Sequence, residues 1–290
     1  MKGIRTVRIL LFFITVLSAF AALSGILSDR GPGSFEHESI RGDVVEIYGR
    51  GIYQHMTAEV AVQGIAQDFV TLLLGIPFLI YGLLLAGKGS YRGRYLLGGV
   101  LAYFLVTYLF YTMMCTYNQL FLIYAALTAL SFFALSITLF SFQPERIPTL
   151  FKEKTPVKPV GGFLIVQALL IALLWLSIIL PPLFDGSIVP REVAHYTTLV
   201  VQGFDLALLL PVAVVSGILL IRKHPYGYLF APVFVIFLAF LMTALTGKVI
   251  GQMVVGVDVG PALIIIPLMN LTAIFFTVLI LASIRKNKAY

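Results

Sequence analysis

Long runs without a charged residue recur along the whole chain, and they constrain its fold more than any other feature. A bilayer core about 30 Å thick requires roughly 20 apolar residues for each helical span. Hydrophobic residues make up 60% of the chain and charged residues only 11%, whereas about a quarter of the residues of a soluble domain are charged. The pattern predicts an all-α polytopic membrane protein with eight transmembrane helices, whose first partner is the lipid bilayer.

Turn residues and charged loops separate the predicted spans. In chain order the spans cover residues 9–28, 57–86, 95–114, 120–142, 162–180, 190–221, 226–245 and 261–284. Pro181-Pro182 is expected to end the fifth span, and Pro190 to open the helix that continues as the sixth. Because the first run follows a basic N-terminus, a cleaved secretory signal is an alternative interpretation of it.

The distribution of charge predicts the side on which each loop lies. Lysines and arginines gather at both termini and in the loops 87–94, 143–159 and 222–223; the exceptions are Arg30, Arg41, Arg50, Arg191 and Lys248. Among the acids, only Glu145 and Glu153 share those loops. The positive-inside rule then predicts that both termini are cytoplasmic. The net charge of +7 reflects topology, so no nucleic-acid partner is expected.

The polar segment 29–56 is predicted to form a small extracytoplasmic loop domain. Two β-prone runs, 44–48 and 52–53, flank Gly49-Arg50-Gly51 and are expected to pair as a hairpin. Such a loop could also contact a membrane-protein partner.

A Gln-Gly pair followed by an acid occurs near the start of the second and sixth spans. The first copy runs from Gln63 to Asp68 and the second from Gln202 to Asp205, and a proline follows in each span. The shared order of a Gln-Gly pair, an acid and a proline predicts a 4+4 parallel internal repeat, in which Asp68 aligns with Asp205. The predicted units are a first half (1–142, including loop 29–56), a cytoplasmic linker (143–159) and a second half (160–290).

Polar side chains beside the two acids form two predicted helical stripes. The first contains Glu59, Gln63, Gln67 and Thr71, next to Asp68, and the second contains His195, Thr198, Gln202 and Asp205. Lys248 is the basic residue whose depth would let it pair with either acid. These residues are the candidate ligands of an outward-facing acidic polar cleft that binds a cation, a proton or a small polar solute. Helix capping and hydrogen bonds between helices are the structural alternatives.

Helix rise predicts the depth of each acid. Asp68 is about 30 Å from Lys88 along a helix, whereas Asp205 is about 26 Å from Arg222. Asp205 is therefore expected to sit deeper in the bilayer. Tyrosines gather towards the outer ends of the third and fourth spans, at Tyr103, Tyr108, Tyr111, Tyr117 and Tyr124. An aromatic belt explains them, with a groove for a sugar or a lipid as the alternative.

Three classes of function stay open. No zinc, P-loop, nucleophile-elbow or dinucleotide motif occurs, so neither a metal nor a cofactor is expected. A permease-like or solute-binding protein is favoured, and an enzyme is not. The enzyme alternative would act on a lipid at the outer leaflet, with His195 and either Asp205 or Glu192 as acid–base pair. The third class is a sensor or assembly subunit that contacts its partner through loop 29–56.

The run from Tyr117 to Tyr124, YNQLFLIY, follows a tyrosine-rich helix. Together they resemble a group of bacterial multi-pass membrane proteins to which no activity is assigned. The resemblance covers spans two to four and implies a location in the bacterial plasma membrane.

Overall fold

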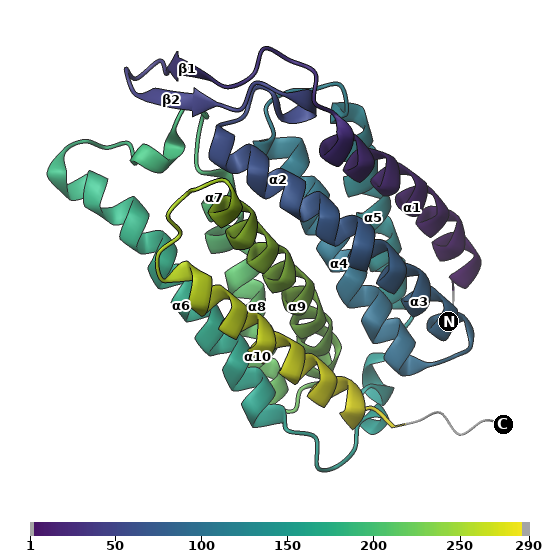
Figure 1. Cartoon of the computed structure of the whole chain (residues 1–290). Helices are drawn as coiled ribbons and strands as arrows, with labels where there is room; N and C mark the ends of the chain where they lie inside the picture. The colour runs from purple at the N-terminus through teal and green to yellow at the C-terminus, as the bar shows by residue number, and fades with distance from the viewer. Residues whose placement is uncertain (1–2, 286–290) are drawn as a thin grey trace.

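Eight helices long and apolar enough to cross a membrane run through residues 3–285, the part of the chain that the structure describes. The structure is a computed structural model, and Figure 1 shows these helices side by side in one bundle with a small hairpin at one end. The chain is therefore a multi-pass integral membrane protein, as its apolar runs predicted.

Six of the spans are single helices. They are α1 (Ile4–Leu27), α4 (Tyr91–Met114), α5 (Phe121–Phe140), α6 (Val157–Asp185), α9 (Pro225–Val254) and α10 (Ala262–Ser283). The other two are each interrupted by a wider, π-helical turn. In the second span, Thr71–Gly75 joins α2 (Ala58–Val70) to α3 (Ile76–Gly87); in the sixth, Asp205–Leu209 joins α7 (Val200–Phe204) to α8 (Leu210–Ile221).

A proline explains each π turn. Pro77 and Pro211 follow the two turns, each as the second residue of the next helix. A proline has no N–H to donate, and its ring crowds the carbonyl four residues earlier. That carbonyl belongs to Leu73 or Ala207, inside the π turn, where the helix widens and accommodates the ring.

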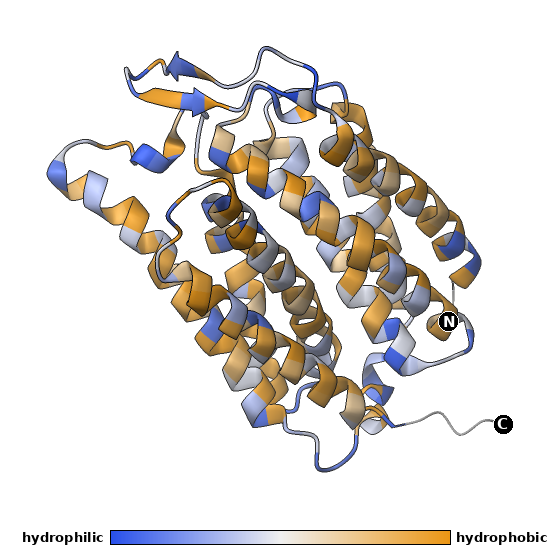
Figure 2. Ribbon diagram, in the orientation of Figure 1, coloured by the Kyte–Doolittle hydropathy of each residue, from blue (hydrophilic) through white to orange (hydrophobic). Residues whose placement is uncertain are grey.

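The centre of the bundle is formed by α4 and α9. In each of them 67% of the most apolar stretch is buried inside the protein, against 17% in α6 and α10. Gly99 allows the close approach, because a Cβ added there would lie 2.4 Å from the Cβ of Ile236. Hydrophobic residues predominate along the peripheral helices, as the ribbon in Figure 2 shows, and many of their large apolar side chains are exposed, which fits a surface in contact with lipid.

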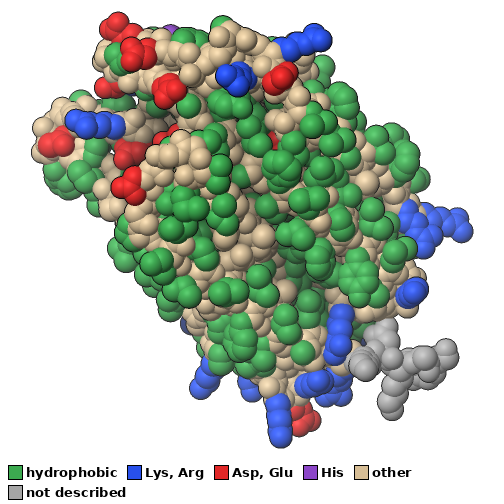
Figure 3. All heavy atoms as spheres, in the orientation of Figure 1, with side chains coloured by type: hydrophobic (Ala, Val, Ile, Leu, Met, Phe, Trp, Pro, Cys, Tyr) green, Lys and Arg blue, Asp and Glu red, His purple; other side chains and the backbone are tan. Residues whose placement is uncertain are grey.

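The two ends of the bundle differ in charge. We call them the hairpin end, where β1 (Phe35–Glu38) and β2 (Val44–Ile47) lie, and the basic end, where the turns 88–90 and 222–224 and the linker 141–156 lie. In Figure 3 the acidic side chains gather at the hairpin end, and lysines and arginines gather at the basic end.

Three expectations about local structure were wrong. Residues 44–47 pair with Phe35–Glu38 instead of with 52–53, because Gly51–Tyr53 turns into a 3-10 helix. The fifth span continues through Pro181-Pro182 to Asp185, since neighbouring groups can satisfy the carbonyls that proline frees in a membrane helix. The sixth span begins at Val200, ten residues after Pro190.

Candidate functional site

Asp68 lies inside the bundle near the hairpin end, and two tyrosine hydroxyls hold its carboxylate. The side chain is only 2% exposed. Tyr53 donates a hydrogen bond to Oδ2 at 2.5 Å, and Tyr111 lies 3.1 Å from Oδ1 and 3.0 Å from the carbonyl oxygen of Gly64. Because a carboxylate in an apolar region is costly when it lacks donors, these hydroxyls account for its presence there.

Two glycines make room for this arrangement. A Cβ on Gly25 of α1 would lie 1.8 Å from Oδ2 of Asp68, and a Cβ on Gly64 would lie 3.0 Å from the ring of Tyr53. No other residue type at position 25 leaves space for the carboxylate in its present position. The site is therefore enclosed by segments from α1, α2, α4 and the loop before α2.

Tyr53 comes from outside the membrane-spanning helices. It ends the 3-10 turn Gly51–Tyr53 in the loop between α1 and α2, and its side chain is buried against Asp68. Burial raises the pKa of the Tyr53 hydroxyl well above its ordinary value, and the negative charge of Asp68 raises it further. The hydroxyl therefore keeps its proton and stays a donor. In this structure Asp68 does not face an open cleft, because Tyr53 covers it.

The inner part of the first polar stripe joins α2 to α4. The amide nitrogen of Gln67 donates to the hydroxyl of Tyr103 at 2.7 Å and to that of Thr107 at 3.1 Å. The hydroxyl of Thr71, at the start of the π turn, lies 2.9 Å from that of Tyr103. All four side chains are buried, so this part of the stripe forms hydrogen bonds between helices rather than lining an open path.

The outer part of the first stripe reaches α9. Glu59 accepts a hydrogen bond of 2.6 Å from Gln252, and Gln63 is half-buried on α2 between Glu59 and Gln67. These contacts place one side of α2 against α9, next to the position of Lys248.

Asp205 is held by the single tryptophan of the chain. It begins the second π turn, is partly exposed, and accepts a hydrogen bond of 2.8 Å from Nε1 of Trp175 on α6. Lys248 on α9 is close enough to attract both Asp205 and Asp68 electrostatically. Within residues 3–285 it forms no ion pair with either acid.

The second polar stripe does not exist as predicted. Residues 194–198 form turns and bends, so His195 and Thr198 lie outside the helix that carries Gln202 and Asp205. Arg41 of the loop before α2 explains why: its guanidinium donates to the carbonyls of Ala194 and Tyr196, which a helix would have used. Thr198 is exposed, and Gln202 is half-buried on α7.

His195 fixes this segment to the loop before α2. Its Nε2–H donates to the carbonyl oxygen of His55 at 2.9 Å, and its ring stands edge-on to that of His37 at 5.9 Å. Nδ1 is buried without a hydrogen-bond partner. In the described part of the chain, no hydrogen bond or ion pair joins His195 to Asp205 or Glu192, the partners that the enzyme hypothesis needs.

The depth estimate and the burial of the two acids differ. Helix rise placed Asp205 deeper in the bilayer, but within the protein Asp68 is the more enclosed, because tyrosines cover it from two sides. The aromatic-belt interpretation is also wrong for Tyr103, Tyr108 and Tyr124, which are fully buried, although Tyr117 is 78% exposed.

Tyr53, Trp175 and Gly25 were missed as site residues. Each comes from a different helix or loop than the acid that it contacts, and none belongs to a periodic pattern that would single it out. Comparison of the chain with family models, curated proteins and solved structures found no match. The function therefore has to be argued from the site itself.

Proposed function

We propose that this integral membrane protein is permease-like and binds a cation or a proton at Asp68 and Asp205. The observation that carries the proposal is the position of Lys248, which attracts both carboxylates without pairing directly with either. If all three groups are ionised, the set has one negative charge in excess. One proton, one monovalent cation or the ammonium group of a polar solute would balance it.

In this proposal the structure represents a closed state of the site. Tyr53 is the cover, because its loop connects α1 to α2 and can move without disturbing a span. Withdrawal of Tyr53 would expose Oδ2 of Asp68 toward the hairpin end and give the outward-facing cleft. Substrate-dependent covering by a loop is a common way to separate a site from bulk water.

A repeat of two four-span halves is part of the same proposal. When the two halves are aligned without a gap, Thr71–Gly75 aligns with Asp205–Leu209, and Pro77 aligns with Pro211. The same alignment brings Gly89 onto Lys223, both with positive φ at the end of a helix. Matching π turns and helix ends support duplication more strongly than matching apolar residues do.

This register differs from the one that the Gln-Gly pairs predicted. It pairs Asp205 with Thr71, and Gln202 with Asp68. The two acids are then neighbouring, non-equivalent positions of the two halves. A site with one acid from each half but at different depths suits a path that is asymmetric along the membrane normal.

The orientation and location belong to the proposal as well. Lysines and arginines at the basic end support a cytoplasmic position for both termini, and the resemblance of spans two to four supports a bacterial plasma membrane.

The test is cation flux in proteoliposomes. Vesicles that contain the purified protein and an internal dye, sensitive to H⁺ in one set and to Na⁺ in another, are given a K⁺ diffusion potential, and the entry of H⁺ or Na⁺ is followed. We expect flux above that of empty vesicles, and its loss in the double variant Asp68→Asn/Asp205→Asn. The control Asp29→Asn/Asp43→Asn removes two exposed acids from the same end and should leave flux unchanged. Equal flux in the two variants, or none in the wild type, rejects the proposal.

A further inference from the structure

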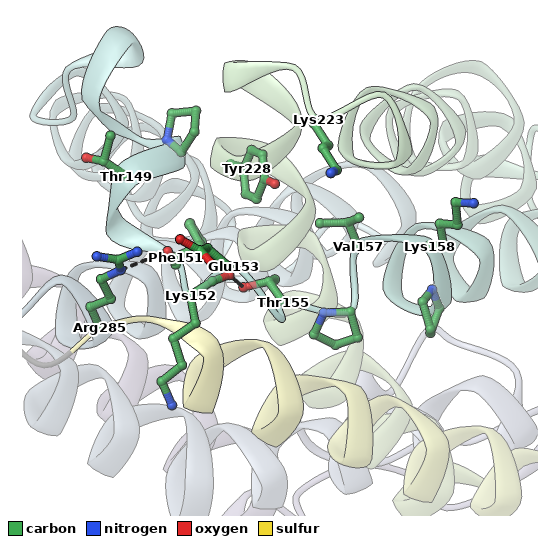
Figure 4. A pocket seen from close by; sticks show the side chains of 13 residues that line it. Thr149, Phe151, Lys152, Glu153, Thr155, Val157, Lys158, Lys223, Tyr228 and Arg285 are labelled. Atoms are coloured by element: carbon green, nitrogen blue, oxygen red, sulfur yellow. Dashed lines mark hydrogen bonds between the residues drawn. The ribbon is translucent and has the colours of Figure 1, made fainter.

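A cavity of about 750 Å³ opens at the basic end of the bundle, far from Asp68. Figure 4 shows it from close by, with Tyr228 near the middle of the view, Lys223 and Lys158 on one side and Arg285 and Lys152 on the other. Four basic side chains and one acidic side chain, Glu153, line it. The cavity therefore attracts anions.

The basic side chains fall into two pairs with different tasks. Lys152 donates to the carbonyl oxygen of Ala282 at 2.8 Å, and Nε of Arg285 donates to that of Phe151 at 3.0 Å. These bonds tie the linker to the end of α10, where Phe151 and Ile284 form an antiparallel bridge. This pair builds one wall of the cavity.

The second pair is available to a ligand. Lys158 and Lys223 are exposed, and within residues 3–285 neither ammonium group has a hydrogen-bond partner. Lys223 adopts a positive φ of 56°, a conformation that glycine usually occupies at the end of a helix. A lysine at this position puts a cation at the cavity at the expense of backbone strain.

Two helices also begin at this cavity. Val157 and Lys158 are the first residues of α6, and Tyr228 lies in the first turn of α9, which starts at Pro225. The amino end of a helix carries a partial positive charge, which favours a phosphate or a carboxylate. The N–H of Val157 already donates to the carbonyl oxygen of Thr155, and those of Gly227 and Tyr228 donate to that of His224. The two helix starts therefore contribute positive charge rather than free donors. The helix ends and the two free lysines thus act on the same space.

We propose that this cavity binds a phosphate-bearing anion, such as the headgroup of an acidic phospholipid at the membrane surface. Lys158 and Lys223 would contact the phosphate, the starts of α6 and α9 would add their positive ends, and Tyr228 would form the floor. The position of the cavity beside the apolar surface of α6 lets the acyl chains of a bound lipid remain in the bilayer. Glu153 opposes binding.

Native mass spectrometry tests this site. The purified full-length chain is incubated in detergent with equal amounts of phosphatidylglycerol and phosphatidylcholine, and the ratio of the two bound lipids is measured. We expect a preference for phosphatidylglycerol that falls roughly tenfold or more in Lys158→Gln/Lys223→Gln. Glu153→Gln should raise the preference. All of these side chains are exposed, so thermal melting should confirm that the variants stay folded.

A matched control separates the site from the general charge of the basic end. Lys88→Gln/Lys154→Gln removes two exposed lysines from the same end, outside the cavity, and should keep the preference. Equal losses in both double variants, or no loss in Lys158→Gln/Lys223→Gln, overturn the proposal. So does a wild-type protein that binds neither phosphatidylglycerol nor inorganic phosphate selectively.

Inorganic phosphate distinguishes the two sources of the anion. If millimolar phosphate displaces phosphatidylglycerol from the wild type, the site recognises a soluble phosphate. If the lipid stays bound, the site recognises the headgroup of a membrane lipid. Both results keep the phosphate site and differ only in what supplies it.

Discussion

At the scale of single residues, the buried position of Asp68 depends both on hydrogen-bond donors and on free space around its carboxylate. Tyr53 and Tyr111 supply hydroxyls, whereas Gly25 supplies the space that Oδ2 occupies. Because the carboxylate is buried, loss of either the donors or the space exposes the protein to the full cost of an unsatisfied charge.

Gly25→Ala should destabilise the protein by roughly 1–3 kcal/mol or more, since the new methyl group would lie 1.8 Å from Oδ2 of Asp68. Thermal melting in detergent measures the loss. Gly162→Ala is the control, because a Cβ there meets nothing within 4 Å and alanine favours a helix. If both variants melt at the same temperature, Gly25 is not a close neighbour of the carboxylate.

The same residues show how much of this site can be predicted from the sequence. Asp68 stood out because acids are rare and costly within membrane spans. Tyr53 did not, because a tyrosine in a polar loop has no pattern that links it to an acid fifteen residues later in a helix. Periodicity predicts which face of one helix is polar, but it does not predict which distant segment covers that face.

At the scale of helices and loops, the loop before α2 competes successfully with helix formation at 194–199. Arg41 donates hydrogen bonds to the carbonyl oxygens of Ala194 and Tyr196. The hydroxyl of Tyr196 accepts a hydrogen bond from the backbone N–H of Thr57. The predicted helix from Pro190 failed for this tertiary reason. By contrast, the strong apolar runs predicted all eight spans, because their length alone decides that they cross a membrane.

The contact of His195 with this loop should weaken at acid pH. Burial lowers the pKa of His195 below its ordinary value. The hydrogen bond to the carbonyl oxygen of His55 opposes this shift, but the His37 ring and the positive charge of Arg41 add to it, so the pKa stays lowered. The docked form therefore favours the neutral ring. Docking is complete above about pH 6.5, the ordinary pKa of histidine, and weakens as the pH falls through the lowered value.

Hydrogen exchange of residues 29–56 measures this effect. We expect severalfold faster exchange at pH 5 than at pH 8, after correction for the intrinsic rate. In His195→Gln an amide can keep the bond to the carbonyl of His55 without titrating, so the extra acceleration should disappear. The same acceleration in both proteins would assign the effect to a group other than His195.

At the scale of the whole molecule, charge separates the two ends of the bundle, and this separation predicts its orientation. In a protein with Cys115→Ser, the variant Arg50→Cys places a thiol on the exposed hairpin end and Lys154→Cys places one on the exposed basic end. A membrane-impermeant maleimide should label position 50 in intact cells and position 154 only after the membrane is opened. The reverse pattern would show that the positive-inside argument fails for this chain.

The enclosure of Asp68 by four segments has a consequence for biogenesis. The ribosome delivers Gly25, Tyr53 and Asp68 well before Tyr111, which lies near the end of α4. The carboxylate therefore reaches the insertion machinery when only one of its two donors has been synthesised. Release of α2 into the lipid at that stage would leave a carboxylate with only one hydrogen-bond donor in the hydrocarbon layer. The first spans are best released together, after α4 has arrived, so that the bilayer receives a site that is already complete.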